Sequence, residues 1–190
     1  MLESVLVANR GEIARRVIAS ARKLGVRSVA IYSEADADLP FVHEADEAVL
    51  IGPPQPAVSY LNSEAILTAA RRTGAQAIHP GYGFLAENAS FAASVIDAGL
   101  IWVGPAPEAI ARMGDKISAR NLMESSGVPV SAGTPRPPEQ LRDALAAAEQ
   151  IGYPVMIKAA AGGGGIGMTV ARDAGELEAG LQTARSRAER

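Results

Sequence analysis

The sequence predicts an α/β protein in which a doubly wound, mostly parallel sheet is followed by a small α+β unit. Three observations carry this prediction. Short apolar runs alternate with amphipathic segments through roughly the first hundred residues, glycines follow several of the expected helices, and the Pro-rich stretch 134–138 marks a boundary before a second unit. Unbroken apolar strands of this kind are typical of a parallel sheet that helices cover on both faces.

The first unit begins with the apolar run 4–8, and an amphipathic helix follows over 12–24, where apolar side chains recur at three- and four-residue steps. Gly25 suits the position after this helix. Further strands are expected at 27–32, 48–51, 76–79 and 100–103, further helices at about 62–73 and 88–98, and a polar stretch through Asp46 between the strands at 27–32 and 48–51.

The rhythm changes after residues 104–107. Helices are expected at about 107–113 and 116–126, the second with Asp115 as its N-cap. Beyond the Pro-rich stretch the sequence predicts a helix over about 138–151, strands at 154–160 and 167–171, and a last helix that begins with the capping box Asp173-x-x-Glu176. We therefore expect an α/β domain over 1–113, a connecting helix and linker over 114–136, and a second, incomplete subdomain over 137–190.

Composition excludes several classes of protein. The 190 residues carry a formal charge of −3, contain no cysteine and two histidines, and are 4% aromatic. A disulfide scaffold and a thiolate metal site are excluded, and neither the positive charge nor the stacking surface of a nucleic-acid binder is present. No apolar run approaches the ~20 residues that span a bilayer, and the N-terminus lacks the pattern of a signal peptide. We expect a cytoplasmic protein with no nucleic-acid or membrane partner.

The strongest chemical signal is the glycine run 162–165, which Ile166 and Gly167 extend. Glycines let backbone N–H groups approach a phosphate closely. A Walker A loop or a dinucleotide fingerprint would open a helix, whereas a strand is expected here. Strand, glycines and strand predict a hairpin lid over nucleotide phosphates, as in kinases; a surface hairpin without a ligand is the alternative.

Two of the three lysines stand where phosphates would explain them. Lys158 lies in an apolar run that leads into the glycines, and a buried ammonium group needs an anionic partner. Lys116 lies at a helix start, where the helix dipole disfavours a cation. The third lysine, Lys23, suits the last turn of its helix. A solvated surface charge is the alternative for Lys116.

Four segments together resemble the biotin carboxylase family, in the family's order and along the whole chain. They are LVANRGEIA (6–14), HPGYGFLAEN (79–88), MGDK (113–116) and IKA (157–159) followed by the glycine run. This family provides the ATP-grasp component of acyl-CoA, pyruvate and urea carboxylases. The resemblance implies a Rossmann-like pre-ATP-grasp domain followed by part of an ATP-grasp lid.

The resemblance also implies the chemistry. Family members use MgATP and bicarbonate to form carboxyphosphate, and carboxylate biotin on a carrier domain, which passes the carboxyl group to a carboxyltransferase partner. By motif, the ATP-binding residues are Lys116, Lys158, Gly163, Gly164, Gly165 and Met168, with Met168 on the adenine. Tyr82, Gly83 and Glu87 would lie near biotin and bicarbonate, although a tight glycine turn with a stacked aromatic explains their loop equally well. A homodimer is possible.

Two departures from the family limit these expectations. Ile166 stands where family members commonly have a basic residue, and the family's magnesium-binding glutamates and bicarbonate-handling residues would lie beyond residue 190. We therefore expect no catalytic residue and no metal ligand within the chain, and no activity from it alone. Another ATP-grasp ligase fragment, or a non-catalytic nucleotide-binding or subunit-interaction module, remains the alternative. An NAD-binding protein is disfavoured because the turn at 9–12 has one glycine where three are needed.

Overall fold

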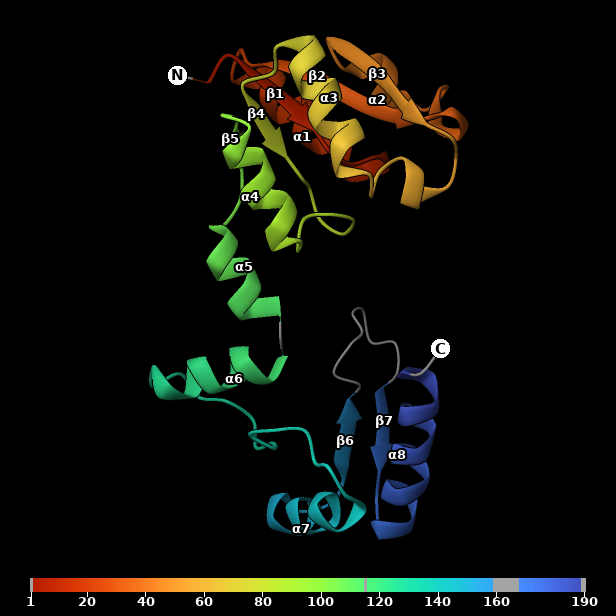
Figure 1. The fold of residues 1–190 in the computed structure, drawn as a ribbon, viewed down its shortest axis with the longest axis vertical. Helices are drawn as coiled ribbons and strands as arrows, with labels where there is room; N and C mark the ends of the chain where they lie inside the picture. Colours follow the sequence, from red (N-terminus) through yellow and green to blue (C-terminus); the bar gives the residue numbers. More distant parts are fainter. Residues whose placement is uncertain (1, 115, 159–167, 189–190) are drawn as a thin grey trace. The chain divides into compact units, whose positions relative to one another are not determined.

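The chain forms two compact units in a computed structural model, Met1–Ala111 and Arg112–Arg190 (Figure 1). The structure describes residues 2–114, 116–158 and 168–188. The expected division at 113 and 136 stays a prediction.

The N-terminal unit is built on a five-stranded, wholly parallel sheet with the order β3-β2-β1-β4-β5. The strands are β1 (Ser4–Val7), β2 (Arg27–Ser33), β3 (Glu47–Gly52), β4 (Ala77–His79) and β5 (Ile101–Trp102). The expected α/β class is confirmed. Because β2 and β3 extend the sheet on one side of β1 and β4 and β5 on the other, β1 is the central strand.

Helices cover both faces of this sheet, as the unbroken apolar strands predict. Successive β1 residues point to opposite faces. Leu6 belongs to a buried cluster with residues of α3 (Ser63–Thr73) and α4 (Ala89–Asp97). Val7 belongs to another cluster with residues of α1 (Gly11–Lys23) and α2 (Pro40–Glu44).

The polar stretch before Asp46, to which the sequence pattern assigns no element, is partly helical. It contains the 3-10 turn η1 (Glu34–Asp36) and the short helix α2. Pro40 stands at the start of α2, where its missing N–H costs nothing. Phe41 is fully buried in the cluster that contains Val7 of β1 and Ile18 of α1. A five-residue helix shows less than two turns of periodicity, so the apolar pattern is too short to reveal it.

The C-terminal unit contains an antiparallel hairpin of β6 (Val155–Lys158) and β7 (Met168–Ala171), which pairs Ile157 with Thr169 and Lys158 with Met168. Its helices are α6 (Lys116–Ser125), α7 (Leu141–Ile151) and α8 (Ala174–Ala188), while α5 (Pro107–Gly114) spans the division between the units. Ile157 and Ala171 from the hairpin are buried with Ala148 of α7 and Leu177 of α8.

Two helix starts in this unit refine the sequence expectations. Helix α7 begins at Leu141 and not at 138. At its start, the backbone N–H of Gln140 donates to the Asp143 carboxylate at 3.3 Å. At α8 the Asp173 carboxylate accepts from the Glu176 N–H at 2.8 Å, as a capping box requires. The Glu176 carboxylate instead accepts from the Arg172 N–H, one residue earlier than expected. Asp115, the expected N-cap of α6, lies outside the described residues.

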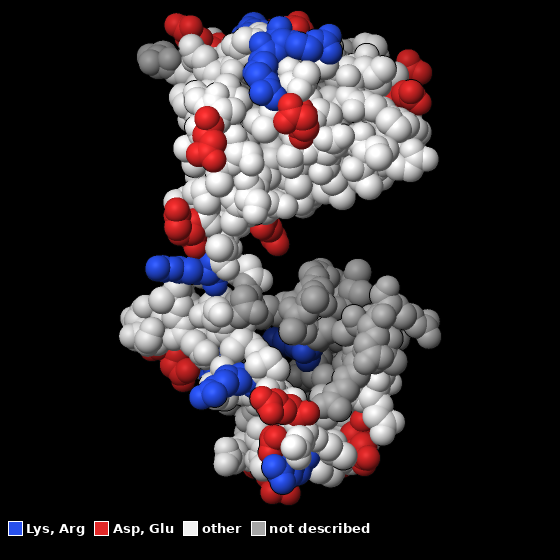
Figure 2. All heavy atoms as spheres, in the orientation of Figure 1, with Lys and Arg blue, Asp and Glu red and all other residues white. Residues whose placement is uncertain are grey.

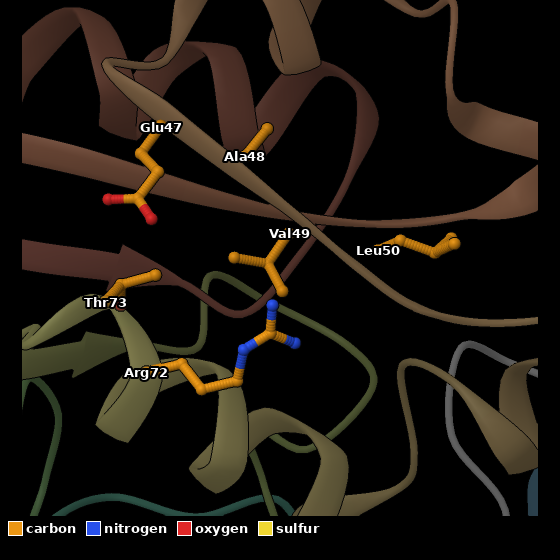
Figure 3. Close-up of a pocket in the computed structure, with 6 residues that line it drawn as sticks. All are labelled: Glu47, Ala48, Val49, Leu50, Arg72 and Thr73. Carbon is orange, nitrogen blue, oxygen red and sulfur yellow. The ribbon is translucent and has the colours of Figure 1, made fainter.

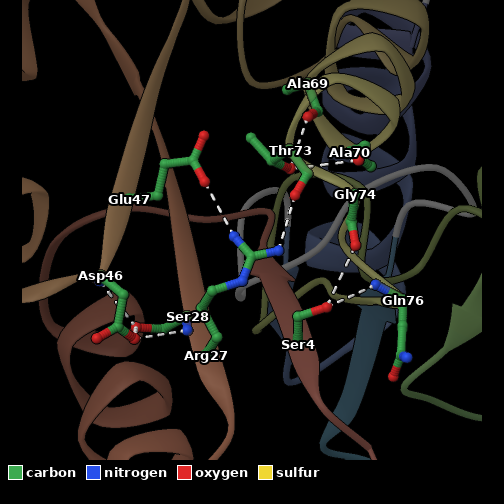
Figure 4. A network of polar contacts seen from close by, with 10 residues as sticks. All are labelled: Ser4, Arg27, Ser28, Asp46, Glu47, Ala69, Ala70, Thr73, Gly74 and Gln76. Carbon is green, nitrogen blue, oxygen red and sulfur yellow. Dashed lines mark hydrogen bonds and ion pairs between the residues drawn. The ribbon is translucent and has the colours of Figure 1, made fainter.

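Polar side chains tie together the amino ends of the strands in the N-terminal sheet (Figure 4). The Arg27 guanidinium donates to the Glu47 carboxylate at 2.9 Å and to the Thr73 carbonyl at 2.7 Å, joining β2, β3 and the end of α3. The Ser4 hydroxyl accepts from the Gln76 N–H at 3.0 Å, which joins β1 to the start of β4. At this end of the sheet, side-chain hydrogen bonds therefore join the strands to one another and to α3.

Charged side chains of both signs are interspersed on the face shown in Figure 2, and most of the visible described surface is uncharged. None of the helices in the described ranges combines the length and the apolar character that crossing a membrane requires.

We predict that Gly52→Ala destabilises the protein by more than Gly74→Ala. Both glycines have positive φ, 143° and 61°, which alanine adopts at a cost. A Cβ at Gly74 would meet open space, whereas one at Gly52 would lie 2.7 Å from the backbone oxygen of Val58. Urea unfolding should show a loss of about 1 kcal/mol for Gly74→Ala and about 2–3 kcal/mol for Gly52→Ala. Equal losses would show that the backbone near Val58 yields freely.

Candidate functional site at the carboxyl ends of strands β1 and β4

The order of the sheet reverses between β1 and β4, because β2 and β3 lie on one side of β1 and β4 on the other. In open α/β sheets, ligands bind outside the carboxyl ends of the strands at such a switch point. The segment after β1 contains Asn9 and Arg10, and the segment after β4 contains residues 80–88. The first two motifs of the sequence therefore meet at this edge.

Asn9 joins the two segments through its buried side chain, which is 3% exposed. Its Nδ2 donates to the Pro80 carbonyl and to the Tyr82 carbonyl, both at 2.7 Å. Its Oδ1 accepts from the backbone N–H of Arg10 at 2.9 Å. All strong hydrogen-bonding groups of the amide are used, so the loop after β4 is fixed to the end of β1 on both sides of Gly81.

Arg10 extends this contact toward β2. Its guanidinium lies 3.3 Å from the Asp36 carboxylate and over the rings of Tyr60 and Phe84, at 5.4 and 5.6 Å from their centroids. The two rings are stacked with centroids 5.1 Å apart. The stacked aromatic foreseen for the loop is therefore Phe84, whose φ of 41° is unusual for a residue with a side chain.

Asp36 is buried, and its carboxylate is fully supplied with donors. The Tyr60 hydroxyl donates to it at 2.7 Å and the Ser33 hydroxyl at 2.8 Å, in addition to Arg10. Burial acts to raise the pKa of Asp36, but these hydrogen bonds and the Arg10 charge outweigh it and lower the pKa below its usual value. Burial and the Asp36 carboxylate raise the pKa of Tyr60. The carboxylate is thus charged and the phenol neutral at pH 7.

Tyr82, Gly83 and Glu87, the expected residues near biotin and bicarbonate, all lie on the exposed side of this loop. The Tyr82 side chain is 59% exposed, and its hydroxyl donates to the Glu12 carboxylate at 3.0 Å, which raises the pKa of Tyr82. Gly83 has a φ of 68°. The loop is a tight glycine turn with a stacked aromatic, and it presents Tyr82 and Glu87 to solvent at the switch point. Their place near biotin and bicarbonate stays a prediction.

His79, the last residue of β4, accepts a hydrogen bond from the backbone N–H of Gly81 through Nδ1 at 3.0 Å. Only the neutral imidazole has a lone pair on Nδ1, so this contact requires the tautomer that is protonated on Nε2. Burial lowers the pKa of His79, and the Arg16 charge lowers it further. The turn at Gly81 is therefore built on a neutral histidine.

The hairpin of the C-terminal unit presents the other set of expected residues. Lys158 and Met168 are paired and share its outer face with Met156 and Val170, while Val155, Ile157 and Ala171 lie on the face toward the helices. Met156, Met168 and Val170 are 50, 48 and 42% exposed. One face of the hairpin is thus an uncovered apolar surface with an ammonium group at its end.

The expectation of a buried Lys158 is wrong. Its side chain is exposed, because a two-stranded sheet packed on one face leaves alternate residues of each strand in solvent. Because Lys158 is exposed, its charge does not require a buried anionic partner. Only its position before the glycine run still points to a phosphate. Gly163, Gly164 and Gly165 lie outside the described residues. Lys116 begins α6, and its side chain also lies outside them.

A hollow of about 360 Å³ lies elsewhere, beside the edge strand β3 and the end of α3 (Figure 3). Glu47, Val49, Leu50 and Arg72 are among its lining residues, and none of the expected site residues is. Within the described part of the chain, no group of three or more His, Asp or Glu side chains is arranged to hold a metal ion.

The motif at 6–14 contains Asn9 and Arg10, but the sequence alone assigns them no role. Asn9 is a polar residue directly after a buried apolar strand, at the end where α/β sheets build sites, and this signal could have singled it out. Its partners could not be identified, because they lie 71 and 73 residues away.

The strand order places the chain among doubly wound α/β proteins, a class in which ligands bind at the switch point. The family model for the biotin carboxylase N-terminal domain matches residues 1–110, so the chain belongs to this family. The model for the ATP-binding domain of the carbamoyl-phosphate synthase L chain matches residues 115–190.

Curated relatives agree. The chain is 52% identical over 177 residues to a biotin carboxylase of Halalkalibacterium halodurans, and 53% identical over 176 residues to the alpha3 subunit of a biotin-dependent acyl-coenzyme A carboxylase of Mycobacterium leprae. These matches cover 93% of this chain but 39 and 29% of the relatives. The chain thus spans about two fifths or less of their length.

Solved structures show the same relation. The biotin carboxylase domain dimer of Hydrogenobacter thermophilus 2-oxoglutarate carboxylase, in complex with MgADP, ADP and bicarbonate, superimposes with a TM-score of 0.93 at 45% identity. A biotin carboxylase complex with β,γ-ATP from Campylobacter jejuni gives 0.94 at 41% identity. Each match covers 99% of this chain and 41 or 42% of the other.

We predict that His79 makes stability depend on pH. Because the pKa of His79 is lower in the folded protein than the ~6.5 of an unfolded chain, the unfolded state binds more protons as pH falls. The stability that this group contributes is complete above about pH 6.5 and is lost progressively below it. Protonation also removes the acceptor for the Gly81 N–H, a bond worth about 1 kcal/mol.

The measurement is urea unfolding at pH 7.5 and pH 5.5 for the wild type, His79→Asn and His43→Asn. Asparagine keeps an acceptor near the place of Nδ1 and does not titrate, so His79→Asn should lose less stability on acidification than the wild type. His43 is exposed, and its variant should follow the wild type. Parallel profiles for all three proteins would refute the role of His79.

Proposed function

We propose that this chain is the N-terminal part of a biotin carboxylase, which uses MgATP and bicarbonate to carboxylate biotin on a carrier protein through carboxyphosphate. The observation that carries the proposal is the hairpin of the C-terminal unit, which pairs Lys158 with Met168 on an exposed apolar face at both ends of the glycine run. The membership of residues 1–110 in the biotin carboxylase N-terminal domain family supports biotin as the acceptor of the carboxyl group.

ATP would bind against the outer face of this hairpin. A purine ring gains by covering apolar side chains, and Met168, Met156 and Val170 offer such a surface. The Lys158 ammonium at the end of the same face would meet phosphate oxygens or a polar edge of the nucleotide. Lys116 and Gly163, Gly164 and Gly165 would add contacts to the phosphates. The relatives solved with ADP, MgADP and β,γ-ATP support a nucleotide of this kind.

Magnesium and the catalytic groups would be supplied from outside this chain. Mg²⁺ neutralises the charge that develops on a transferred phosphoryl group. Glu176 and Glu178, the carboxylates that follow the hairpin, are both exposed, and among the described residues neither belongs to a cluster that could hold a metal. We therefore assign to this chain the binding of the nucleotide and a part of the site for biotin and bicarbonate. We assign it no bond-breaking step.

Tyr82, Gly83 and Glu87 would lie at the biotin and bicarbonate end. Their support is the position of their loop at the switch point and its exposure. The partners would be a biotin carboxyl carrier domain and a carboxyltransferase subunit or domain, and a second copy of the protein would form a homodimer. The dimer of the Hydrogenobacter thermophilus domain supports the last of these.

A different ATP-grasp ligase is the second candidate, since the match over residues 115–190 is to an ATP-binding domain of another enzyme. The match over residues 1–110 and the named relatives favour the carboxylase. Bicarbonate-dependent ATP hydrolysis that biotin stimulates would distinguish the two.

We predict that Lys158→Ala in the full-length protein raises the KM for ATP about tenfold or more, because an ion contact to a nucleotide is worth 1.5–3 kcal/mol or so. Lys23→Ala is the matched control. It removes an exposed lysine from the last turn of α1, far along the chain from the hairpin, and should leave the KM unchanged. An unchanged KM in Lys158→Ala would remove the support that the hairpin gives to this function.

We predict that the 190-residue chain by itself hydrolyses no ATP in response to bicarbonate and binds MgATP weakly at best. The reason is that the described residues offer the nucleotide one apolar face and no group of carboxylates arranged to hold a metal ion. Calorimetric titration with MgATP, with the Lys158→Ala chain beside it, measures the binding, and phosphate release measures turnover. Clear turnover by the chain alone would contradict this division of roles.

A further inference from the structure

The loop after β4 is held at both ends by residues of the turn after β1. At one end, the Asn9 amide donates to the carbonyls of Pro80 and Tyr82, at 2.7 Å each. At the other end, the Arg10 guanidinium lies over Phe84 and is itself held by Asp36. Tyr82 and Gly83, which directly precede Phe84, are exposed.

Asn9 and Gly81 are matched in shape. A Cβ added to Gly81 would lie 2.7 Å from the Asn9 Nδ2 and 3.0 Å from the Ile13 Cγ1, so only glycine lets the amide reach both carbonyls. The φ of Gly81 is 67°, which glycine also adopts without strain. The close fit leaves the loop no room to move toward the sheet.

Phe84 shows that the loop is held against its own preference. A φ of 41° is unfavourable for a residue with a Cβ, at a cost on the order of 1–3 kcal/mol. The stacking of its ring on Tyr60 and the cation of Arg10 above both rings offset this cost. The loop conformation is therefore imposed by the turn after β1 and its partners.

We propose, resting on the function proposed above, that Asn9 is a positioning residue for the carboxylation of biotin, with Arg10 as its supporting partner. Asn9 is buried and cannot touch a substrate in solvent. It acts by fixing the backbone of Tyr82 and Gly83, which present the loop to biotin and bicarbonate. ATP binding belongs to the C-terminal unit and does not depend on Asn9.

The test compares Asn9→Asp with Asn62→Asp in the full-length protein. At position 9 the carboxylate has no hydrogens to donate and would face two carbonyl oxygens, so the loop loses its anchor. At position 62 the side chain caps α3 by accepting from the Ala65 N–H at 3.1 Å, a task that aspartate performs equally well. The two variants carry the same chemical change.

Two readouts separate positioning from general damage. In steady-state assays with free biotin, Asn9→Asp should raise the KM for biotin on the order of tenfold to a hundredfold and leave the KM for ATP within about twofold. In hydrogen exchange followed by mass spectrometry, protection should fall in peptides covering 80–88 and stay unchanged in those covering β2. Asn62→Asp should match the wild type in both.

An unchanged KM for biotin with unchanged exchange in 80–88 overturns the proposal, and so does an equal rise in both KM values with exchange increased throughout the N-terminal unit. If Asn9→Asp does not fold, Arg10→Met takes its place, because methionine keeps an unbranched apolar side chain and loses the cation that lies over the rings. This variant should raise the KM for biotin and not that for ATP. If the wild-type full-length protein shows no biotin-dependent turnover, the proposed function is refuted. The exchange data still decide whether Asn9 holds the loop.

Discussion

The side chain of Asn9 connects the two halves of the parallel sheet where a ligand would bind. The sheet grows outward from β1 in two directions, so the carboxyl ends of β1 and β4 are adjacent in space although they are far apart in the chain. One buried amide spans this junction with both of its N–H groups. Because an unsatisfied buried amide is costly, the contact also dictates that Gly81 has no side chain and that the loop after β4 follows a single path.

The two ends of the sheet use polar side chains for different purposes. At the amino ends, Arg27, Ser4 and Ser28 join neighbouring strands through contacts that are local to the sheet. At the carboxyl ends, a buried carboxylate, Asp36, collects donors from Ser33, Tyr60 and Arg10 and so supports an aromatic pair beneath an exposed loop. The first arrangement stabilises the fold. The second stabilises a loop conformation that the fold alone would not favour.

The hairpin of the C-terminal unit is buried on one face only. Its two strands pack on α7 and α8 through a small cluster around Ile157 and Leu177, and Gly180 of α8 lies so close to the Ile157 Cδ1 that an added Cβ would clash with it. The opposite face of the hairpin stays open and apolar. A surface of this kind gains by being covered, which is why we place the nucleotide there.

Local pattern determined most of the secondary structure. Unbroken apolar runs specified the parallel strands, and the breakers Gly25, Gly74 and the Pro-rich stretch marked the ends of elements, because periodicity and backbone restriction act over a few residues. The hairpin around the glycine run was predicted for the same reason. The short helix α2 was missed, since five residues carry too little pattern. The environment of Lys158 was predicted wrongly, since an apolar run does not reveal whether one face of a strand or both are covered.

The sequence by itself determined the α/β class, the family and the chemical character of the motifs, because these depend on residue types and spacing along the chain. Only the tertiary structure decided that Asn9 meets Pro80 and Tyr82, that Arg10 lies over Phe84, and that Lys158 is exposed beside Met168. These facts depend on strand order and on which face of a sheet is covered. Both are settled by packing between segments that are distant in sequence, and no local pattern records them.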